Sequence, residues 1–151
     1  MSTTPALNGQ VIGQTHYATR ALLERAVAPL GLSFGQVLTL NVLADGAVDR
    51  ARLVHRITST LKIDESAVHE VIAQLVDADL VQVDEGPSTS AEAQIRLTDN
   101  GHATQRRVSA AVADITARLY GDIPADEASA AARVLTLVTQ RANAELAATP
   151  A

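Results

Sequence analysis

Four cations and several hydroxyl side chains are concentrated in residues 50–62, and their types suit contacts with phosphate groups. Each Lys or Arg that neutralises a phosphate releases counterions, so the contact adds both affinity and salt dependence. Ser and Thr hydroxyls donate to phosphate oxygens without adding charge. The candidates for phosphate contact are Arg50, Arg52, Arg56, Thr58, Ser59, Thr60 and Lys62. The alternative is that these side chains form an ordinary solvated helix face.

Residues 66–74 carry side chains that can read the edges of base pairs. Gln pairs well with adenine, and Ser can bond to more than one base. The candidates for base contact are Ser66, His69 and Gln74. Ser88 and Thr89 follow in a loop and can donate to phosphate or sugar, and Arg96 comes after that loop. The loop hydroxyls are equally well explained as a polar loop tip.

The charge of the same region opposes contact with DNA. From residue 64 to residue 95 the chain has eight acidic residues and no Lys or Arg. Acidic side chains repel the DNA backbone, and the net charge of the whole chain is −5, against the basic balance typical of nucleic-acid binders. Two hypotheses therefore stay open, a surface that binds duplex DNA and a surface that no longer does.

The spacing of apolar residues predicts six helices and one β-hairpin that would position these groups. The expected helices are residues 6–28, residues 33–44, residues 50–61, and segments that begin at Asp64, at Thr98 and at Pro124. Residues 81–83 and 95–97 alternate as two half-buried strands, and residues 47–48 can add at most one bridge to them. The predicted fold class is mainly α, with six helices and a small β-hairpin wing.

Several helix starts have recognisable signals. Ser33 and Gln36 match a capping box, in which the hydroxyl accepts from the third amide and the Gln reaches back. Asp64 is placed to cap the fourth helix, and Leu7 falls on the apolar face of the first. The apolar stripe of the fourth helix is Val68, Val71, Ile72 and Leu75. The candidates for base contact therefore lie on its exposed side.

Composition excludes several kinds of site. The 151 residues suit a single domain, and the absence of cysteine excludes disulfides, thiolate zinc sites and Cys nucleophiles. The four His residues show no His-x-x-x-His spacing, and there is neither a Gly-rich phosphate loop nor a Gly-x-Ser-x-Gly motif. We therefore expect no catalytic residue, no metal site, no cofactor and no enzymatic activity.

The two ends of the chain favour a cytoplasmic protein that pairs with a second copy. The N-terminus has neither the basic segment nor the apolar run of a signal peptide, and no apolar run is long enough to span a membrane. The terminal helices have more apolar surface than the central lobe can cover. Closed two-fold dimers are the commonest way to bury such a surface.

Three segments give the chain a resemblance to the MarR family of bacterial transcription regulators. They are LGLSFGQVLTLNVLA (residues 30–44), SAVHEVIAQLVDADLVQV (residues 66–83) and RLTDNG (residues 96–101). The resemblance implies one winged helix-turn-helix domain over residues 1–151, with the DNA-reading lobe at residues 32–98. Residues 6–31 and 99–147 would form the platform of a homodimer that binds a palindromic operator in double-stranded DNA.

The resemblance also implies a pocket for a small aromatic or anionic effector between the lobe and the dimer helices. The residues at that place are His16, Tyr17, Arg20 and Phe34, which we expect to form a buried polar cluster. The alternative, which we favour, is a set of hydrogen bonds within the dimer interface.

The sequence departs from the family at the surface that would read DNA. Family members often carry Arg or Lys where this chain has Glu70, Gln74 and Val83, and the wing, residues 85–92, has no Arg. Asp79 stands where a Gly is expected, and Asp tolerates a positive φ better than most residues. The second hypothesis is therefore a ligand-sensing or protein-interaction module with weak or no DNA binding.

Overall fold

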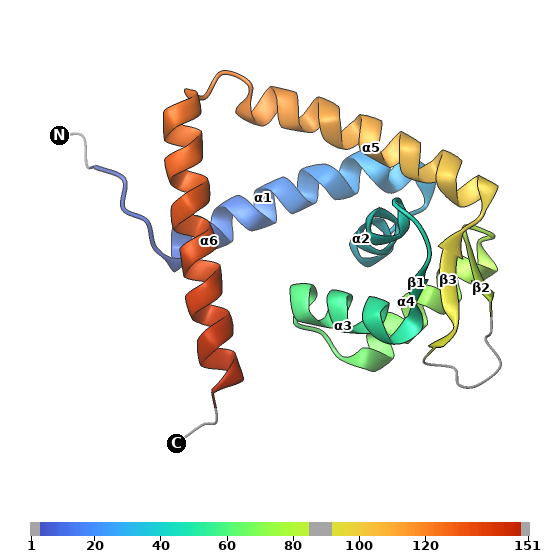
Figure 1. Ribbon diagram of the computed structural model, residues 1–151. Helices are drawn as coiled ribbons and strands as arrows, with labels where there is room; N and C mark the ends of the chain where they lie inside the picture. Colours follow the sequence, from blue (N-terminus) through green and yellow to red (C-terminus); the bar gives the residue numbers. More distant parts are fainter. Residues whose placement is uncertain (1–3, 85–91, 149–151) are drawn as a thin grey trace. The chain divides into compact units, whose positions relative to one another are not determined.

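The computed structural model describes residues 4–84 and 92–148 (Figure 1). In those residues the helices are α1 (Gly9–Val27), α2 (Phe34–Leu43), α3 (Arg50–Leu61), α4 (Glu65–Asp77), α5 (Asp99–Tyr120) and α6 (Ala125–Ala147), with a 3₁₀ turn η1 (Ala28–Leu30). The strands are β1 (Val48–Asp49), β2 (Val81–Asp84) and β3 (Gln94–Leu97). The predicted fold class, six helices with a small β-hairpin wing, is confirmed.

The strands form one antiparallel sheet in the order β1-β3-β2. β2 and β3 make the predicted hairpin, with Val81 opposite Leu97 and Val83 opposite Ile95. The expectation of at most one bridge near residues 47–48 is wrong, because β1 pairs at two positions, Val48 with Ile95 and Asp49 with Gln94. This pairing fixes the start of α3, which follows β1 directly, against the edge of the sheet.

The contacts of the chain divide it into two compact units, residues 1–113 and residues 114–151. The first unit contains the sheet, α1 to α4 and the first part of α5. Apolar side chains from α2, α3, α4 and β3 form its core. The fully buried ones include Leu40, Leu53, Ile72, Leu75 and Ile95. Burial of each such side chain stabilises the folded chain by about 1.5–3 kcal/mol. The apolar faces that the sequence pattern gives to these elements are therefore the ones that pack together.

Helix starts follow the capping signals with two exceptions. The capping box is present, since Ser33 accepts from the amide of Gln36 and its own amide donates to the Gln36 side chain. The first helix begins three residues later than residue 6, because the Asn8 side chain accepts from the Val11 amide and ends the extended segment. Leu7 therefore lies outside α1. Asp64 occupies the cap position of α4, but its side chain makes no capping bond.

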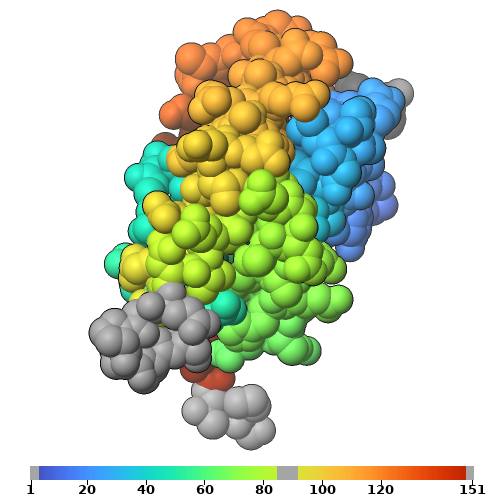
Figure 2. All heavy atoms as spheres, turned by 90° about the vertical axis from the view of Figure 1, so that its right-hand side faces the viewer, coloured from blue at the N-terminus to red at the C-terminus, as the bar shows by residue number. Residues whose placement is uncertain are grey.

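A close backbone approach joins the start of α5 to the turn after α4. The amide of Thr98 donates to the carbonyl of Leu80, and its hydroxyl donates to the carbonyl of Asp79 over 2.7 Å. Asp79 has the positive φ expected of it, +60°. A Cβ on Gly101 would lie 1.9 Å from the Leu80 carbonyl oxygen, so only glycine fits there. In the space-filling view these two segments, coloured lime and gold, form one continuous surface (Figure 2).

The second unit contains the end of α5 and the whole of α6. None of the residues of α6 is buried in the single chain. Large apolar side chains exposed on it are Val134, Leu135, Leu137, Val138 and Leu146. No single helix among the described residues is long and apolar enough to cross a membrane, although the bent pair of residues 9–30 and 34–43 meets those criteria together.

Candidate nucleic-acid interface

The groove between α3 and α4 brings together three of the predicted contact residues, Arg50, Thr58 and His69. A side-chain nitrogen of Arg50, Nη1, lies 3.0 Å from Nδ1 of His69. The groove has a volume of about 290 Å³, and Glu65 also lines it. Arg50 is at the first turn of α3 and His69 is on the exposed face of α4, so both are held by well-packed helices.

The chemistry of the Arg50–His69 contact fixes the tautomer of the imidazole. A guanidinium has only donors, so Nδ1 of His69 must accept and the ring proton must sit on Nε2. His69 then presents an N–H donor to whatever lies on the outer side of α4. Donors of this kind suit phosphate oxygens and base acceptors.

The remaining candidates on α4 divide between its two ends. Ser66 is exposed in the first turn, as the periodicity predicts. Gln74 lies two turns later, and its side-chain oxygen accepts from Nε2 of the Gln36 side chain over 3.0 Å. The Gln36 side chain also completes the capping box of α2. The Gln74 side chain is therefore committed to a contact with α2.

The hydroxyl and lysine candidates lie along the second half of α3. The Thr58 hydroxyl donates to the carbonyl of His55, and the ammonium of Lys62 donates to the carbonyl of Ser59. Lys62 caps the helix in the left-handed conformation, with a φ of +58°. Ser59 and Thr60 are exposed. Because the Thr58 hydroxyl already donates its proton to His55, its oxygen can only accept a further hydrogen bond.

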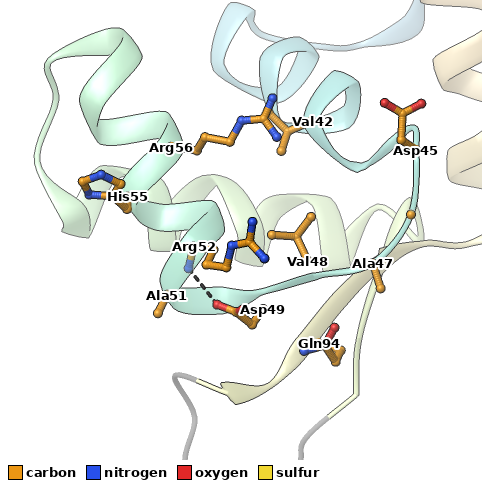
Figure 3. A pocket seen from close by; sticks show the side chains of 11 residues that line it. Val42, Asp45, Ala47, Val48, Asp49, Ala51, Arg52, His55, Arg56 and Gln94 are labelled. Carbon is orange, nitrogen blue, oxygen red and sulfur yellow. Dashed lines mark hydrogen bonds between the residues drawn. The ribbon is translucent and has the colours of Figure 1, made fainter.

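Arg52 and Arg56 lie on the other side of α3. They line a cavity of about 810 Å³ between the end of α2, β1 and α3 (Figure 3). In Figure 3 the Arg56 side chain runs toward Val42 and the Arg52 side chain runs toward Val48. His55 lines both this cavity and the α3–α4 groove. The predicted phosphate-contacting set is thus split between two sides of one helix.

The wing candidates are described only in part. Ser88 and Thr89 lie outside the described residues. Arg96, on β3, forms an ion pair with Asp84 on β2, with Nε and Oδ2 2.7 Å apart. Gln82 donates to the other oxygen of Asp84 over 3.0 Å. The charge of Arg96 is therefore largely balanced by its neighbour on the hairpin.

The candidate effector residues do come together, at the meeting of α1 and the start of α2. The Arg20 guanidinium lies 4.3 Å from the centre of the Phe34 ring, and the rings of His16 and Phe34 are 6.4 Å apart. Arg20 also pairs with Glu24 over 2.6 Å. The expectation that this cluster is buried is wrong for the single chain, where Tyr17 is 71% exposed.

The exposure of this cluster has a simple cause. Only the last part of α1 packs against the core of the unit, through Leu23 and Val27. His16, Tyr17 and Arg20 lie one to two turns earlier and remain exposed in the single chain. Among the residues the structure describes, no group of three or more His, Asp or Glu side chains could hold a metal ion.

The cavity beside Arg52 and Arg56 has no counterpart in the sequence-based prediction. Its walls come from one continuous stretch, residues 42–56, which runs from the end of α2 through the turn and β1 into α3, and from Gln94 of β3. The folding of this stretch back on itself and the position of Gln94 cannot be read from residue spacing. The available signal was the i, i+4 separation of the two arginines, which puts them on one side of a helix.

Comparison with models of protein families finds no match, and comparison with curated protein sequences finds none either. Many solved structures match. PcaV, a transcriptional regulator from Streptomyces coelicolor solved with its natural ligand, aligns with a TM-score of 0.75 at 22% identity, covering 94% of this chain and 99% of that one. CouR from Rhodococcus jostii RHA1, solved with p-coumaroyl-CoA, aligns with a TM-score of 0.74 at 19% identity, covering 87% of this chain and 90% of that one.

A mutant MarR from E. coli, solved in complex with operator DNA, aligns with a TM-score of 0.72 at 20% identity, covering 86% of this chain and 91% of that one. The structural neighbours are MarR-family regulators. At these identities the likeness concerns the fold. The chain has the winged-helix fold of those regulators, over nearly its whole length.

Proposed function

We propose that this chain is a homodimeric transcription regulator of MarR type that docks on duplex DNA through α3, α4 and the wing. The observation that carries the proposal is the α3–α4 groove, where Arg50 and His69 meet on the outer side of a winged unit. A winged lobe of the same fold belongs to a protein that was solved on operator DNA. Such a regulator would act in the cytoplasm of a bacterium and would not be an enzyme.

In this proposal the contacts have unequal roles. Arg50 and Lys62 would contact phosphates, while Ser66 and the Nε2–H of His69 would face base edges. The Thr58 hydroxyl would donate to a phosphate only after leaving the His55 carbonyl. Ser59, Thr60 and the wing hydroxyls Ser88 and Thr89 would supply neutral donors. Gln74 and Arg96 would contribute only after leaving the partners they have in the free chain, Gln36 and Asp84.

The acidic residues argue for modest affinity. Glu65 lines the same groove as Arg50, and Asp64 precedes it. A carboxylate near the DNA backbone raises the free energy of docking, so specific binding must draw on base contacts and on a second lobe. Two lobes joined in a dimer can supply this if the half-sites lie about one helical turn, ~34 Å, apart.

The homodimer is supported by the unpartnered apolar surface of α6. Monomers rarely expose contiguous apolar patches of this kind, and a second copy is the simplest cover. Leu135 and Val138 lie one turn apart near the middle of the helix, and both are about two-fifths exposed. A two-fold axis there would pair each helix with its own copy.

The proposal includes a small-molecule effector that shifts the distance between the two lobes. The cluster of His16, Tyr17, Arg20 and Phe34 supports this, because it offers a cation and aromatic rings to an anionic aromatic compound. Two proteins of the same fold were solved with bound ligands, p-coumaroyl-CoA in one case. In this chain the same cluster could serve the dimer interface instead, and a soaked ligand would distinguish the two.

Selection from a random pool of duplex DNA tests the function directly. We expect a palindrome with half-sites about one helical turn apart, and a steep negative slope of log affinity against log salt. Failure to enrich any sequence, together with no measurable binding at low salt, would contradict the proposal.

That negative outcome would favour the second candidate function, a protein-interaction or ligand-sensing module. The observation in its favour is the ion pair of Arg96 with Asp84, in which the carboxylate offsets the positive charge of Arg96 on the hairpin. The neighbouring α4 is already acidic. A basic partner protein would then bind this face.

A further inference from the structure

We propose that the cavity between the end of α2, β1 and α3 is a binding site for a small organic anion, held by Arg52 and Arg56. The ligand class is a carboxylate or phosphate monoester with an apolar body. The site differs in place from the cluster on α1 and from the α3–α4 groove, although Ala51 and His55 line both the cavity and that groove. Its occupation does not depend on DNA binding, so it can be tested even if the proposed function fails.

The first argument is that both guanidiniums are unpaired in the part of the chain that the structure describes. Within residues 4–84 and 92–148, neither guanidinium takes part in an ion pair, whereas Arg20, Arg96 and Arg118 do. Like charges four residues apart on a helix repel each other and cost a few tenths of a kcal/mol. An anion between the two guanidiniums would remove that repulsion and accept several charge-assisted hydrogen bonds.

The second argument is that the acids lining the cavity leave the arginines available. The Asp49 carboxylate accepts from the backbone amide of Arg52 over 2.8 Å and thereby caps α3. Asp45 sits at the opposite edge, in the turn after α2, away from both guanidiniums in Figure 3. The cavity therefore has one cationic side and one acidic side, which would orient a ligand that carries both an acid and a neutral or donor group.

The third argument is the shape and lining of the cavity. Its volume of about 810 Å³ falls in the range of small-molecule sites, which are ~300–1,000 Å³. Val42, Val48 and the methyl groups of Ala47 and Ala51 supply apolar walls beside the arginines. Gln94 adds an amide at the β3 side. A free inorganic ion would use only the cationic side, so an organic anion fits the whole site better.

Backbone amide chemical shifts of the full chain, recorded without DNA, provide the test. Benzoate is the probe, benzamide is its neutral counterpart, and inorganic phosphate is the anion without an apolar body. We expect benzoate to shift the amides of Gly46, Ala47 and Ala51 with saturation. Benzamide should give no saturable shift at these amides, and phosphate should bind more weakly than benzoate.

Substitutions then identify the cationic side. Arg52→Gln and Arg56→Gln should each weaken benzoate binding by about tenfold, the loss expected for one charge-assisted contact. Arg56→Lys should bind better than Arg56→Gln, because it keeps the charge. Arg107→Gln, an exposed arginine of α5 that does not line the cavity, is the matched control and should bind like the parent chain.

Other results would overturn the site. Equal shifts with benzamide would show that the cavity binds apolar compounds without regard to charge. Benzoate shifts that are confined to the α1 cluster and unaffected by Arg56→Gln would show that the anion binds at that cluster instead. If benzoate and phosphate fail to bind, while Arg52→Gln with Arg56→Gln flattens the salt dependence of DNA binding, the arginines serve the DNA backbone instead.

Discussion

Nη1 of Arg50 lies 3.0 Å from Nδ1 of His69, so the first residue of α3 is bonded to the middle of α4 across the groove. Because Arg can only donate, we predict that the neutral His69 ring carries its proton on Nε2. Nitrogen-15 spectra of the imidazoles measure this directly. Arg50→Ala should move the ring toward the mixture of tautomers of a free imidazole, with His102 of α5 as the reference. A dominant Nδ1–H tautomer in the parent chain would contradict the contact.

The same arginine should be visible in the salt dependence of DNA binding. We predict that Arg50→Ala lowers the magnitude of the slope of log affinity against log salt by about two per dimer, because one phosphate contact, worth ~0.9, is lost from each of the two lobes. The slope is measured on random duplex DNA, where base contacts do not interfere. Arg107→Ala should leave it unchanged. An unchanged slope in the Arg50 variant would remove this residue from the contact set.

The apolar surface of α6 predicts the oligomeric state. Leu135→Lys combined with Val138→Lys should convert a dimer into a monomer, because each lysine would have to be desolvated in the interface. Sedimentation equilibrium measures the change. Gln140→Lys adds a charge to the opposite side of α6 and should leave the dimer intact. A parent chain that is already monomeric would contradict the proposed dimer.

The contact between Gly101 and the Leu80 carbonyl predicts a large effect on stability. Gly101→Ala should lower the free energy of unfolding by about 2 kcal/mol or more, because α5 must move away from the turn after α4. Gly35→Ala is the control, since its Cβ would meet Val71 at an ordinary 3.5 Å. It should be neutral or stabilise α2 by up to about 1 kcal/mol. Urea unfolding measures both.

The two aspartates that precede α3 and α4 should differ in their effects. Asp49 accepts from the Arg52 amide, whereas Asp64 makes no such bond. We predict that Asp49→Ala costs about 1 kcal/mol of stability and that Asp64→Ala costs less than about half of that, through the helix dipole alone. Equal losses in thermal unfolding would mean that Asp64 caps α4 in solution.

Much of the fold could be read from the sequence because it depends on local physics. The i, i+3, i+4, i+7 stripe of Val68 to Leu75 specifies one buried side of α4, whatever it packs against. The Ser33–Gln36 capping box and the positive φ at Asp79 are likewise set by neighbours in the chain. The predicted start of α1 is three residues too early, because the apolar spacing continues past a stronger signal, the cap at Asn8.

The candidate site depended on tertiary structure. Sequence spacing made Arg50, Arg52 and Arg56 one outward-facing set. The rotation of α3 about its axis, fixed by burial of Leu53 and Ile57, directs Arg50 to α4 and the other two to α2 and β1. The pairings of Gln74 with Gln36 and Arg96 with Asp84 likewise join different elements. Periodicity fixes which side of a helix is buried, but only packing decides which neighbour each exposed side chain meets.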